Sequence, residues 1–286
     1  MNLREAVSYV QSQGLDSGDA YALVLHALGR AITERAWLLA HGEQDLSTRA
    51  VSQLTQAVQR RAHDEPVAYI TGCKEFYGLP LAVDARVLDP RADTETLVDW
   101  TLEALANKPK ARVLDLGTGS GAVALALKHQ RPAWEVYAVD ISADALAVAA
   151  DNARRLHLTV QFAQASWLQG CAGGCKDRCK GGFTGRFDAI VSNPPYIAEG
   201  DAHLTALRHE PCLALVSGAD GLNAIRSIVS QAPARLVPGG WLLLEHGYNQ
   251  AVAVRHLLGA AGLVTVQSRR DLAGIERCSG AQSQAA

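Results

Sequence analysis

Apolar residues in roughly the first sixty positions recur at three- and four-residue intervals, which is the spacing of one face of an α-helix. The interval is clearest in the run Val24, Ala27, Leu28, Ala31 and Ile32. Asp16, Asp45 and Ser47 stand where side chains that cap helices are expected. The pattern therefore predicts a bundle of about four short helices between Leu3 and about Arg61.

A different pattern begins near Phe76, where the sequence FYGLPLAVDARV alternates apolar and polar residues around Gly78 and Pro80. Alternation about a glycine turn predicts a β-hairpin or an extended linker, and we place a domain boundary here. The predicted division is an N-terminal helical domain at 1–75, a hairpin or linker at 76–88, and a larger domain at 89–286.

Beyond this point strands and helices alternate along the chain. The strand patterns lie at 111–116, 135–139, 159–164, 187–192, 241–245 and 263–268. The helical patterns lie at 95–106, 120–130, 142–156, 221–236 and 249–260. Such alternation is typical of a parallel sheet with helices on both faces, and so predicts an α/β, Rossmann-like fold. The last segment is weakly patterned, and the glycine- and cysteine-rich stretch 170–185 is predicted to be a surface insertion.

Composition narrows the class of protein. Of 286 residues, 48% are hydrophobic and 20% charged, which is enough apolar material for a sizeable core. The net charge of -2 provides no general attraction to nucleic acid. Because no run reaches the roughly 18 apolar residues of a membrane span, and the first residues do not resemble a signal peptide, we expect a cytoplasmic protein.

Three of the six cysteines, Cys171, Cys175 and Cys179, are separated by three residues each. This spacing falls within the loose range for zinc ligands, although the only candidates for a fourth ligand are Cys212 or a histidine brought close by folding. We expect reduced thiols in a flexible loop without metal. A structural zinc ion and redox chemistry are the alternatives.

The run VLDLGTGSG, from Val113 to Gly121, places an apolar strand before a glycine-rich turn that opens a helix, and such a turn lets the backbone approach a ligand closely. Its Gly-x-Gly-x-Gly spacing differs from the Gly-x-Gly-x-x-Gly turn that binds the pyrophosphate of a dinucleotide, which disfavours a nicotinamide cofactor. S-adenosylmethionine has no phosphate and needs only a close glycine backbone and hydrogen-bond partners. Asp140, roughly 20 residues further on at the next strand end, can accept both hydroxyls of an adenosine ribose. Trp167 either covers the adenine face or packs in the core. Asp115 either orients the turn or meets the cofactor ammonium.

The sequence Asn193-Pro194-Pro195-Tyr196 follows the strand at 187–192, at the carboxyl edge where an open α/β sheet binds ligands. Prolines lack amide hydrogens, so this turn presents carbonyl oxygens without competing donors. Such a turn suits methylation of a planar NH₂ group, whose delocalised lone pair is a poor nucleophile. If the Asn193 side-chain oxygen and the Pro194 carbonyl each accept one N–H, the lone pair can localise for in-line attack. Tyr196 would pack against the planar substrate and shield the cationic methyl donor.

Over nearly its whole length the chain resembles the release factor glutamine methyltransferases, the PrmC/HemK family. The resemblance rests on the stretches EPVAYITG, EFYGL, PRADTETLV, DLGTGSG, FDAIVSNPPYI and LLLEHG. It implies a small N-terminal helical domain that binds the substrate protein, a hairpin, and a seven-stranded class I methyltransferase domain. It also implies methyl transfer from S-adenosylmethionine to the glutamine of a Gly-Gly-Gln loop in peptide chain release factors.

The resemblance further implies the residues of the site. Cofactor contacts are expected from Gly117, Thr118, Gly119, Ser120, Gly121, Asp140, Trp167 and Asn193. Catalytic and substrate contacts are expected from Asn193, Pro194, Pro195 and Tyr196. The chain departs from the common family pattern where Asp89 replaces an apolar residue, Ala92 a proline, and Ser166 an acidic residue that could contact the adenine amino group.

The roles of four other residues have two interpretations. Glu245 and His246 follow a buried strand, where capping and packing are expected and acid–base work is the alternative. Tyr69 and Arg91 either have structural roles or face the substrate protein.

Three other functions compete with the main hypothesis. Amino methylation of adenine or cytosine in nucleic acid uses the same turn on a flipped base. A related enzyme could act on a glutamine of a ribosomal protein, and a regulator could bind the cofactor without turnover. The lack of a basic field and the N-terminal resemblance disfavour the first two, and the intact Asn193 to Tyr196 turn disfavours the third. We therefore expect release factors as partners, without stable nucleic-acid binding or a membrane.

Overall fold

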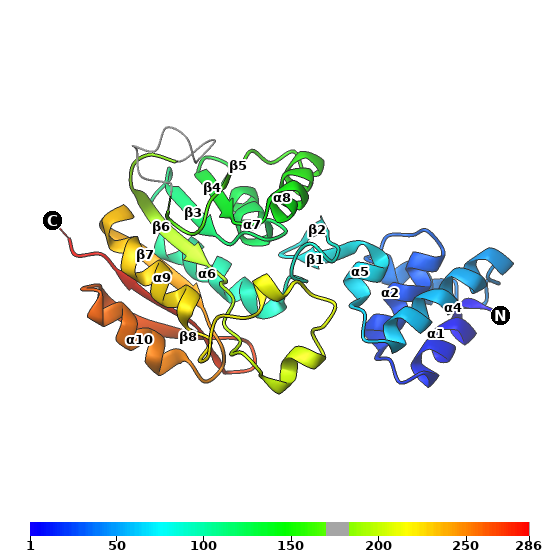
Figure 1. Cartoon of the computed structure of the whole chain (residues 1–286). Coiled ribbons are helices and arrows are strands. Elements are labelled where there is room, and N and C mark those ends of the chain that lie inside the picture. Colours follow the sequence, from blue (N-terminus) through cyan, green and yellow to red (C-terminus); the bar gives the residue numbers. More distant parts are fainter. Residues whose placement is uncertain (170–182, 286) are drawn as a thin grey trace.

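The structure is a computed structural model that describes residues 1–169 and 183–285. A helical N-terminal unit lies at one end of the molecule, and a short hairpin joins it to a larger α/β unit (Figure 1). The three clustered cysteines, Cys171, Cys175 and Cys179, lie outside the described residues, so the predictions made for them are not tested.

Five helices form the N-terminal unit: α1 (Leu3–Ser12), α2 (Ser17–Ala27), α3 (Arg35–Ala40), α4 (Thr48–Ala62) and α5 (Val67–Thr71). Asp16 and Ser47 cap α2 and α4 as predicted, each accepting a backbone N–H from the first turn of its helix. Asp45 does not cap a helix, because it pairs with Asn2 in an isolated bridge while Asn2 itself caps α1. The four predicted helices are confirmed, and α5 extends the unit toward the hairpin.

The hairpin consists of β1 (Cys73–Phe76) and β2 (Leu79–Ala82). Phe76 pairs directly with Leu79, so Tyr77 and Gly78 form a two-residue turn in which both residues have positive φ. Of the predicted hairpin and extended linker, the structure therefore shows the hairpin. It begins at Cys73 and not near Phe76, because the turn lies before Leu79. The domain division at 75 and 88 stays a prediction.

Seven strands form the sheet of the larger unit: β3 (Arg112–Leu116), β4 (Glu135–Asp140), β5 (Gln161–Gln164), β6 (Phe187–Ser192), β7 (Leu236–Glu245), β8 (Val264–Arg270) and β9 (Glu276–Gln282). Their order is β5-β4-β3-β6-β7-β9-β8. Strands β5 to β7 in this order are parallel, whereas β9 runs antiparallel to both β7 and β8. The mostly parallel α/β fold predicted from the alternation is confirmed.

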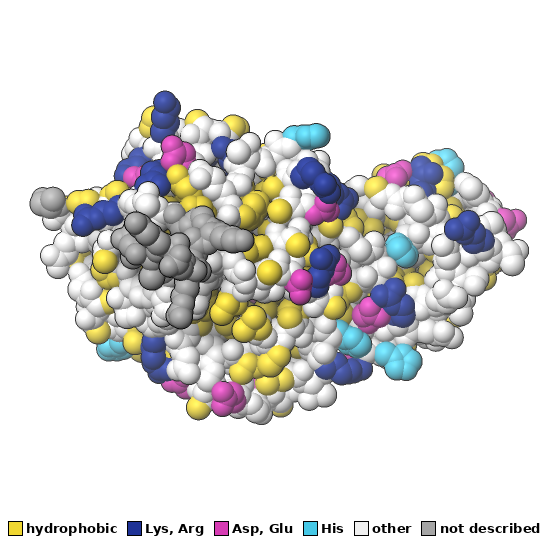
Figure 2. Space-filling model, turned by 45° about the horizontal axis from the view of Figure 1, so that its top comes forward, with side chains coloured by type: hydrophobic (Ala, Val, Ile, Leu, Met, Phe, Trp, Pro, Cys, Tyr) yellow, Lys and Arg dark blue, Asp and Glu magenta, His cyan; other side chains and the backbone are white. Residues whose placement is uncertain are grey.

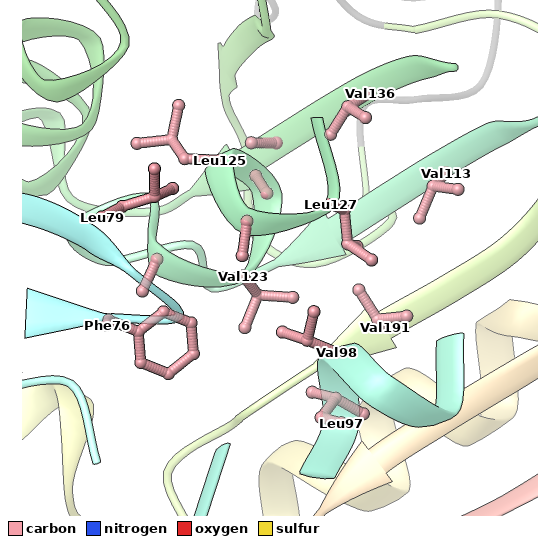
Figure 3. Packing of buried hydrophobic residues seen from close by; sticks show 14 of the residues in the cluster. Phe76, Leu79, Leu97, Val98, Val113, Val123, Leu125, Leu127, Val136 and Val191 are labelled. Carbon is pink, nitrogen blue, oxygen red and sulfur yellow. The ribbon is translucent and has the colours of Figure 1, made fainter. Parts of the chain in front are cut away.

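Helices cover both faces of the sheet: α6 (Glu95–Ala104), α7 (Ala122–Gln130), α8 (Ala143–Arg155), α9 (Asn223–Gln231) and α10 (Ala251–Ala260). Side chains from α6, α7, α8 and the hairpin form one buried layer, and side chains from α9 and α10 form the other. Consecutive strand residues alternate between the layers, as Val113 and Leu114 do. Figure 3 shows Phe76 of the hairpin beside Val123 of α7 in the first layer.

Short 3₁₀ helices complete the unit: η1 (Ala92–Thr94), η2 (Ala202–Thr205), η3 (Cys212–Ala214) and η4 (Ala232–Arg235). In the part of the chain that the structure describes, no helix is both long and apolar enough to cross a membrane.

Two features of the C-terminal part differ from the predictions. The helix predicted near 221–236 is present as α9 followed directly by η4, but β7 begins at Leu236, five residues before the predicted 241, with an irregular pairing to β6 near its start. Strand β9 was missed, because ERCSGAQ contains few β-branched or aromatic residues. Its four central residues, 278–281, are nevertheless buried, and Gly280 packs closely against Trp100 of α6 and Leu243 of β7.

Gly280 tests the packing of β9. A Cβ atom at this position would lie 2.4 Å from Leu243 Cδ2 and 3.0 Å from the Trp100 ring. We expect Gly280→Ala to lower the free energy of unfolding by about 1–3 kcal/mol, measured by urea denaturation. Gly259→Ala in α10 is the matched control, because no described atom lies within 4 Å of its added Cβ and alanine favours a helix by about 0.5–1 kcal/mol. Equal effects of the two substitutions would contradict this packing.

Candidate active site

Three loops meet at the carboxyl edge of the sheet because β3 pairs in parallel with both β4 and β6. Leu116, the last residue of β3, is level with Val139 of β4 and Ser192 of β6. The glycine-rich turn, Asp140 and the turn that starts at Asn193 therefore emerge side by side. This is the position at which open α/β sheets bind ligands, where the chain leaves neighbouring strands in opposite directions.

The glycine-rich turn needs left-handed backbone. Gly117, Gly119 and Gly121 have φ of 70°, 55° and 84°, respectively, a region that favours glycine. The backbone N–H groups of Gly117 and Thr118 both donate to the Val139 carbonyl, which holds the turn against β4. A Cβ at Gly117 would lie 3.3 Å from the Trp167 ring, so the absence of a side chain lets the indole approach the turn.

A cavity of about 430 Å³ opens beside this turn, and its size is suitable for a nucleoside-sized ligand. Predicted site residues that line it are Gly117, Gly119, Asp140, Trp167, Asn193 and Pro195. Thr118, Ser120 and Gly121 do not line it. Thr118 Oγ1 donates to Asp115, the Ser120 carbonyl accepts from Asn152, and Gly121 packs against Leu125 and Ala149.

Asp140 presents a carboxylate at the tip of β4. Its Oδ2 accepts the Gly119 N–H and its Oδ1 accepts the Ser142 N–H, both at 2.9 Å. Each oxygen keeps a further lone pair for a ligand hydroxyl. Burial raises the pKa of Asp140, while the backbone N–H groups lower it. The carboxylate is thus fixed in position with acceptor capacity left, as recognition of a ribose diol requires.

Asp115 has a different role from Asp140. It is buried under the turn, its pKa is raised to about 7 by desolvation, and it accepts hydrogen bonds from the Thr118 hydroxyl and the Ala124 backbone. It does not line the cavity. Of the two predicted roles, the structure favours orientation of the turn.

Trp167 lines the cavity together with apolar residues that the sequence did not single out. It has positive φ, 50°, and its ring is held against Gly117. Ile141, Ala165 and Leu213 line the same cavity, which gives a flat aromatic ligand apolar contacts. Ser166 also lines it, at the position where the common family pattern has an acidic residue.

Much of the remaining cavity wall comes from 211–224, which was not predicted to belong to the site. Ser217, Gly218 and Asn223 are among its lining residues. The sequence offered one signal for this part of the cavity wall, the turn composition of Gly218 and Gly221 on either side of Ala219-Asp220.

The turn that begins at Asn193 is held from several sides. Asn193 Nδ2 donates to Thr94 Oγ1 at 3.0 Å, so the other arm of the amide carries the acceptor oxygen. Gln250 Nε2 donates to the Tyr196 carbonyl at 3.0 Å. A Cβ at Gly221 would lie 2.2 Å from that same carbonyl oxygen, so only glycine fits there.

A second cavity, of about 230 Å³, lies on the other side of this turn and includes Tyr196 and Arg91 in its lining. Leu88, Asn193 and Ala214 line both cavities. Asn193 thus stands at the boundary between a nucleoside-sized cavity and a smaller one. Pro194 lines neither cavity, so the predicted role of its carbonyl is untested.

Of the residues with two interpretations, Tyr69 and His246 have structural contacts. The Tyr69 hydroxyl donates to the Val87 carbonyl at 2.5 Å. His246 contacts the Gly247 carbonyl and Ser279, and burial lowers its pKa. Arg91 pairs with the Glu210 carboxylate at 2.5 Å and with Asp89 at 3.6 Å.

Glu245 is almost completely buried, and desolvation raises its pKa to about 7. It lies beneath the Asn193 turn and does not line either cavity. Among the described residues, no group of three or more His, Cys, Asp or Glu side chains is arranged to hold a metal ion.

Comparisons with known proteins agree with this geometry. The family described as "PrmC N-terminal domain" matches residues 2–72, and "Methyltransferase small domain" matches residues 93–210. The release factor glutamine methyltransferase of Xylella fastidiosa (strain Temecula1) is 46% identical over 269 residues, which are 93% of each chain. That of Escherichia coli K12 is 42% identical over 278 residues, 96% of this chain and 95% of the relative.

The chain belongs to the release factor glutamine methyltransferase family. A methyltransferase structure from Pyrococcus furiosus, 18% identical, matches with a TM-score of 0.52 over 81% of this chain and all of that chain, and shares its fold. S-adenosylmethionine is accordingly the cofactor, and the residues present fit it. The Asp140 carboxylate would offer an acceptor to its ribose, the glycine backbone a close approach to its amino-acid end, and Trp167 a flat apolar surface to its adenine.

Asp140 provides a test of cofactor recognition. We expect Asp140→Asn to weaken S-adenosylmethionine binding by about 10–100-fold, measured by isothermal titration calorimetry, because one charged acceptor is lost. Glu135→Gln, at the opposite end of β4, is the control and should bind as the parent does. Unchanged affinity in Asp140→Asn would contradict the assignment of the ribose contact.

Proposed function

We propose that the protein transfers a methyl group from S-adenosylmethionine to the side-chain amide nitrogen of the glutamine in the Gly-Gly-Gln loop of peptide chain release factors. The observation that carries the proposal is the position of Asn193, whose side chain borders both cavities while its NH₂ group is bonded to Thr94. The relatives named above, which are release factor glutamine methyltransferases, support the choice of substrate.

The reaction requires an amide nitrogen to act as a nucleophile. The Asn193 side-chain oxygen and the Pro194 carbonyl each accept one N–H of the substrate glutamine, which orients the NH₂ group and localises its lone pair. Bound S-adenosylmethionine supplies an electrophilic methyl group on a sulfonium centre. As the nitrogen–carbon bond forms, the carbon–sulfur bond would break with its electron pair left on the sulfur of the thioether product, S-adenosylhomocysteine, and the nitrogen would release one proton to solvent water. The turn therefore acts through hydrogen-bond acceptors in fixed positions.

Tyr196 contributes by packing. Its side chain lines the smaller cavity, and burial followed by the nearby Glu245 charge raises the pKa of its hydroxyl. The hydroxyl therefore stays protonated at neutral pH and does not serve as a base. Its ring offers a flat surface to the glutamine amide, and Pro195 separates the ring from the cofactor cavity.

The substrate protein is proposed to reach the site along a third cavity, of about 430 Å³, between the N-terminal helices and the larger unit. Charged side chains in its lining are Asp19, Arg61, Asp64, Lys74, Glu75, Asp89, Arg91 and Glu210. Arg91 also lines the smaller cavity, so the two are adjacent. This arrangement supports a substrate-binding role for the N-terminal domain at 1–75.

The same turn chemistry could serve the amino group of adenine or cytosine. On the face that Figure 2 shows, Lys and Arg side chains lie beside Asp and Glu side chains instead of forming a continuous basic surface. Specific nucleic-acid recognition usually relies on such a surface. This distribution favours a protein substrate, and a ribosomal-protein glutamine is kept as an outcome of the test.

The decisive experiment supplies labelled S-adenosylmethionine to the purified protein with four acceptors in separate reactions: a release factor, its Gln-to-Ala loop mutant, ribosomal proteins and DNA. Label is expected in the unmutated release factor alone. Label in DNA or ribosomal proteins but not in the release factor would reject the proposal, as would equal labelling of the loop mutant.

Asn193 tests the acceptor role. We expect Asn193→Ala to lower kcat by about 10²–10³-fold, because a group aimed at the reacting centre is removed. The dissociation constant of the cofactor should change by less than about threefold, since Asp140 and the glycine turn remain. Asn107→Ala, on the exposed loop before β3, is the control. Parallel losses of turnover and cofactor binding would refute the acceptor role.

A further inference from the structure

Two polar side chains are buried directly behind Asn193 without reaching either cavity. Thr94 closes η1 and is 4% exposed, and Glu245 ends β7 and is 1% exposed. Glu245 Oε2 has no partner that satisfies full hydrogen-bond geometry among the described residues. A buried carboxylate is costly unless other groups compensate its charge, so its position behind the turn calls for an explanation.

Thr94 connects this carboxylate to the site. Its Oγ1 accepts a hydrogen bond from Asn193 Nδ2 at 3.0 Å. Thr94 also neighbours Glu245, and its hydroxyl lowers the pKa of the buried carboxyl group. The Tyr196 hydroxyl approaches Glu245 Oε1 at 3.5 Å, a long contact from the other end of the same turn. The three side chains Asn193, Thr94 and Glu245 thus form a line from the site into the core.

The direction of each hydrogen bond along this line follows from the number of protons. A threonine hydroxyl has one hydrogen, and an ionised carboxylate can only accept. Because Asn193 Nδ2 donates to Thr94 Oγ1, the Thr94 oxygen acts as an acceptor toward the amide, and its own hydrogen remains available to the neighbouring Glu245 carboxylate. The oxygen arm of the amide then faces away from Thr94.

We propose that Thr94 is a positioning residue that, together with the Glu245 carboxylate, fixes the orientation of the Asn193 amide so that its oxygen is presented to the substrate glutamine. The inference rests on the proposed function, since it explains how Asn193 accepts the glutamine N–H. If the Asn193 amide were rotated by half a turn, its NH₂ group would face the NH₂ group of the substrate glutamine, and no hydrogen bond could form between them. The hydrogen bond left unmade in this way would lower the rate by roughly 10–100-fold.

Thr94 is itself held in place from both sides. Its neighbour Asp93 pairs with Arg277 of β9, with Nε and Oδ2 3.3 Å apart. On the other side, Glu95 begins α6 and accepts the Tyr77 N–H of the hairpin at 2.9 Å. Thr94 is therefore held between residues that are anchored to the hairpin and to the C-terminal strand.

The test compares Thr94→Val, which keeps the shape of the side chain but lacks the hydroxyl, with Thr94→Ser, which keeps the hydroxyl. With a release factor as substrate, we expect Thr94→Val to lower kcat by about 10–100-fold while the KM for the release factor and the dissociation constant of the cofactor change by less than about threefold. Thr94→Ser should stay within about threefold of the parent kcat.

Thr94→Ala is a second variant without the hydroxyl, in case the valine methyl group disturbs the fold. A parent-like kcat in Thr94→Val or Thr94→Ala would overturn the proposal, and so would an equal loss in Thr94→Ser. Loss of cofactor binding by both hydroxyl-free variants would assign Thr94 a purely structural role and also overturn it. Failure of the parent enzyme to label the release factor would instead reject the proposed function.

The pH dependence of kcat gives an independent readout. The groups that face Glu245 are Thr94 and Asp93 from η1, Tyr196 from the turn after β6, and Arg277 and Cys278 from β9. Burial raises the pKa of Glu245 to about 7, so the carboxylate is ionised above that pH and protonated below it. We expect kcat at saturating cofactor to be maximal above about pH 7 and to fall as the pH decreases through that value.

Glu245→Gln removes the titrating group at nearly constant shape. We expect this variant to have a lower kcat that no longer falls as the pH decreases from about 8 to 6, because its side chain cannot change charge. Retention of the parent's acid limb in Glu245→Gln would show that another group causes it and would contradict the role of the carboxylate.

Discussion

The parallel pairing of β3 with β4 on one side and β6 on the other is the constraint on which the site depends. It makes Leu116, Val139 and Ser192 level with one another, so that the glycine turn, Asp140 and Asn193 leave the sheet at one edge. Two further hydrogen bonds, from Gly117 and Thr118 to the Val139 carbonyl, bend the chain over the end of β4. The main chain therefore sets the distance between cofactor groups and acceptor groups before any side chain is chosen.

The same edge is tied to the hairpin and to the N-terminal unit through a few hydrogen bonds. Asn152 of α8 exchanges hydrogen bonds with the Ala82 backbone of the hairpin and donates to the Ser120 carbonyl in the glycine turn. Arg208 and His209, on the loop after the Asn193 turn, contact the His63 carbonyl at the end of α4. The hairpin and this loop both reach from the cofactor site to the helical unit, so the charged cavity between the units is built by segments that also shape the active site.

The sequence allowed prediction of the features that depend on neighbouring residues. Strands β3, β4 and β6 have apolar runs followed by recognisable turns, and the caps of α2 and α4 are local. It did not allow prediction of β9, whose buried residues are small or polar, or of the cavity wall at 211–224. The contact of Asn193 with Thr94 spans 99 positions in sequence, and no local pattern encodes it. Nor does a glycine motif reveal that Thr118 and Ser120 face inward, because that depends on how Asp115 and Asn152 pack beneath the turn.

The distribution of charge around the turn explains why hydrogen-bond direction matters more here than proton transfer by a base. Among the described residues, Arg91 is the charged group that lines the smaller cavity, and the raised pKa of Tyr196 keeps its hydroxyl neutral. The Glu245 carboxyl group, which the Tyr196 hydroxyl approaches at 3.5 Å, lines neither cavity. A carboxylate exposed to the cavity would attract the sulfonium and the substrate N–H groups alike. Because the Thr94 hydroxyl stands between Glu245 and Asn193 in the proposed arrangement, the carboxylate acts on the substrate only by orienting the Asn193 amide. An amide oxygen presented to the substrate favours an NH₂ group over a hydrogen-bond acceptor of similar size.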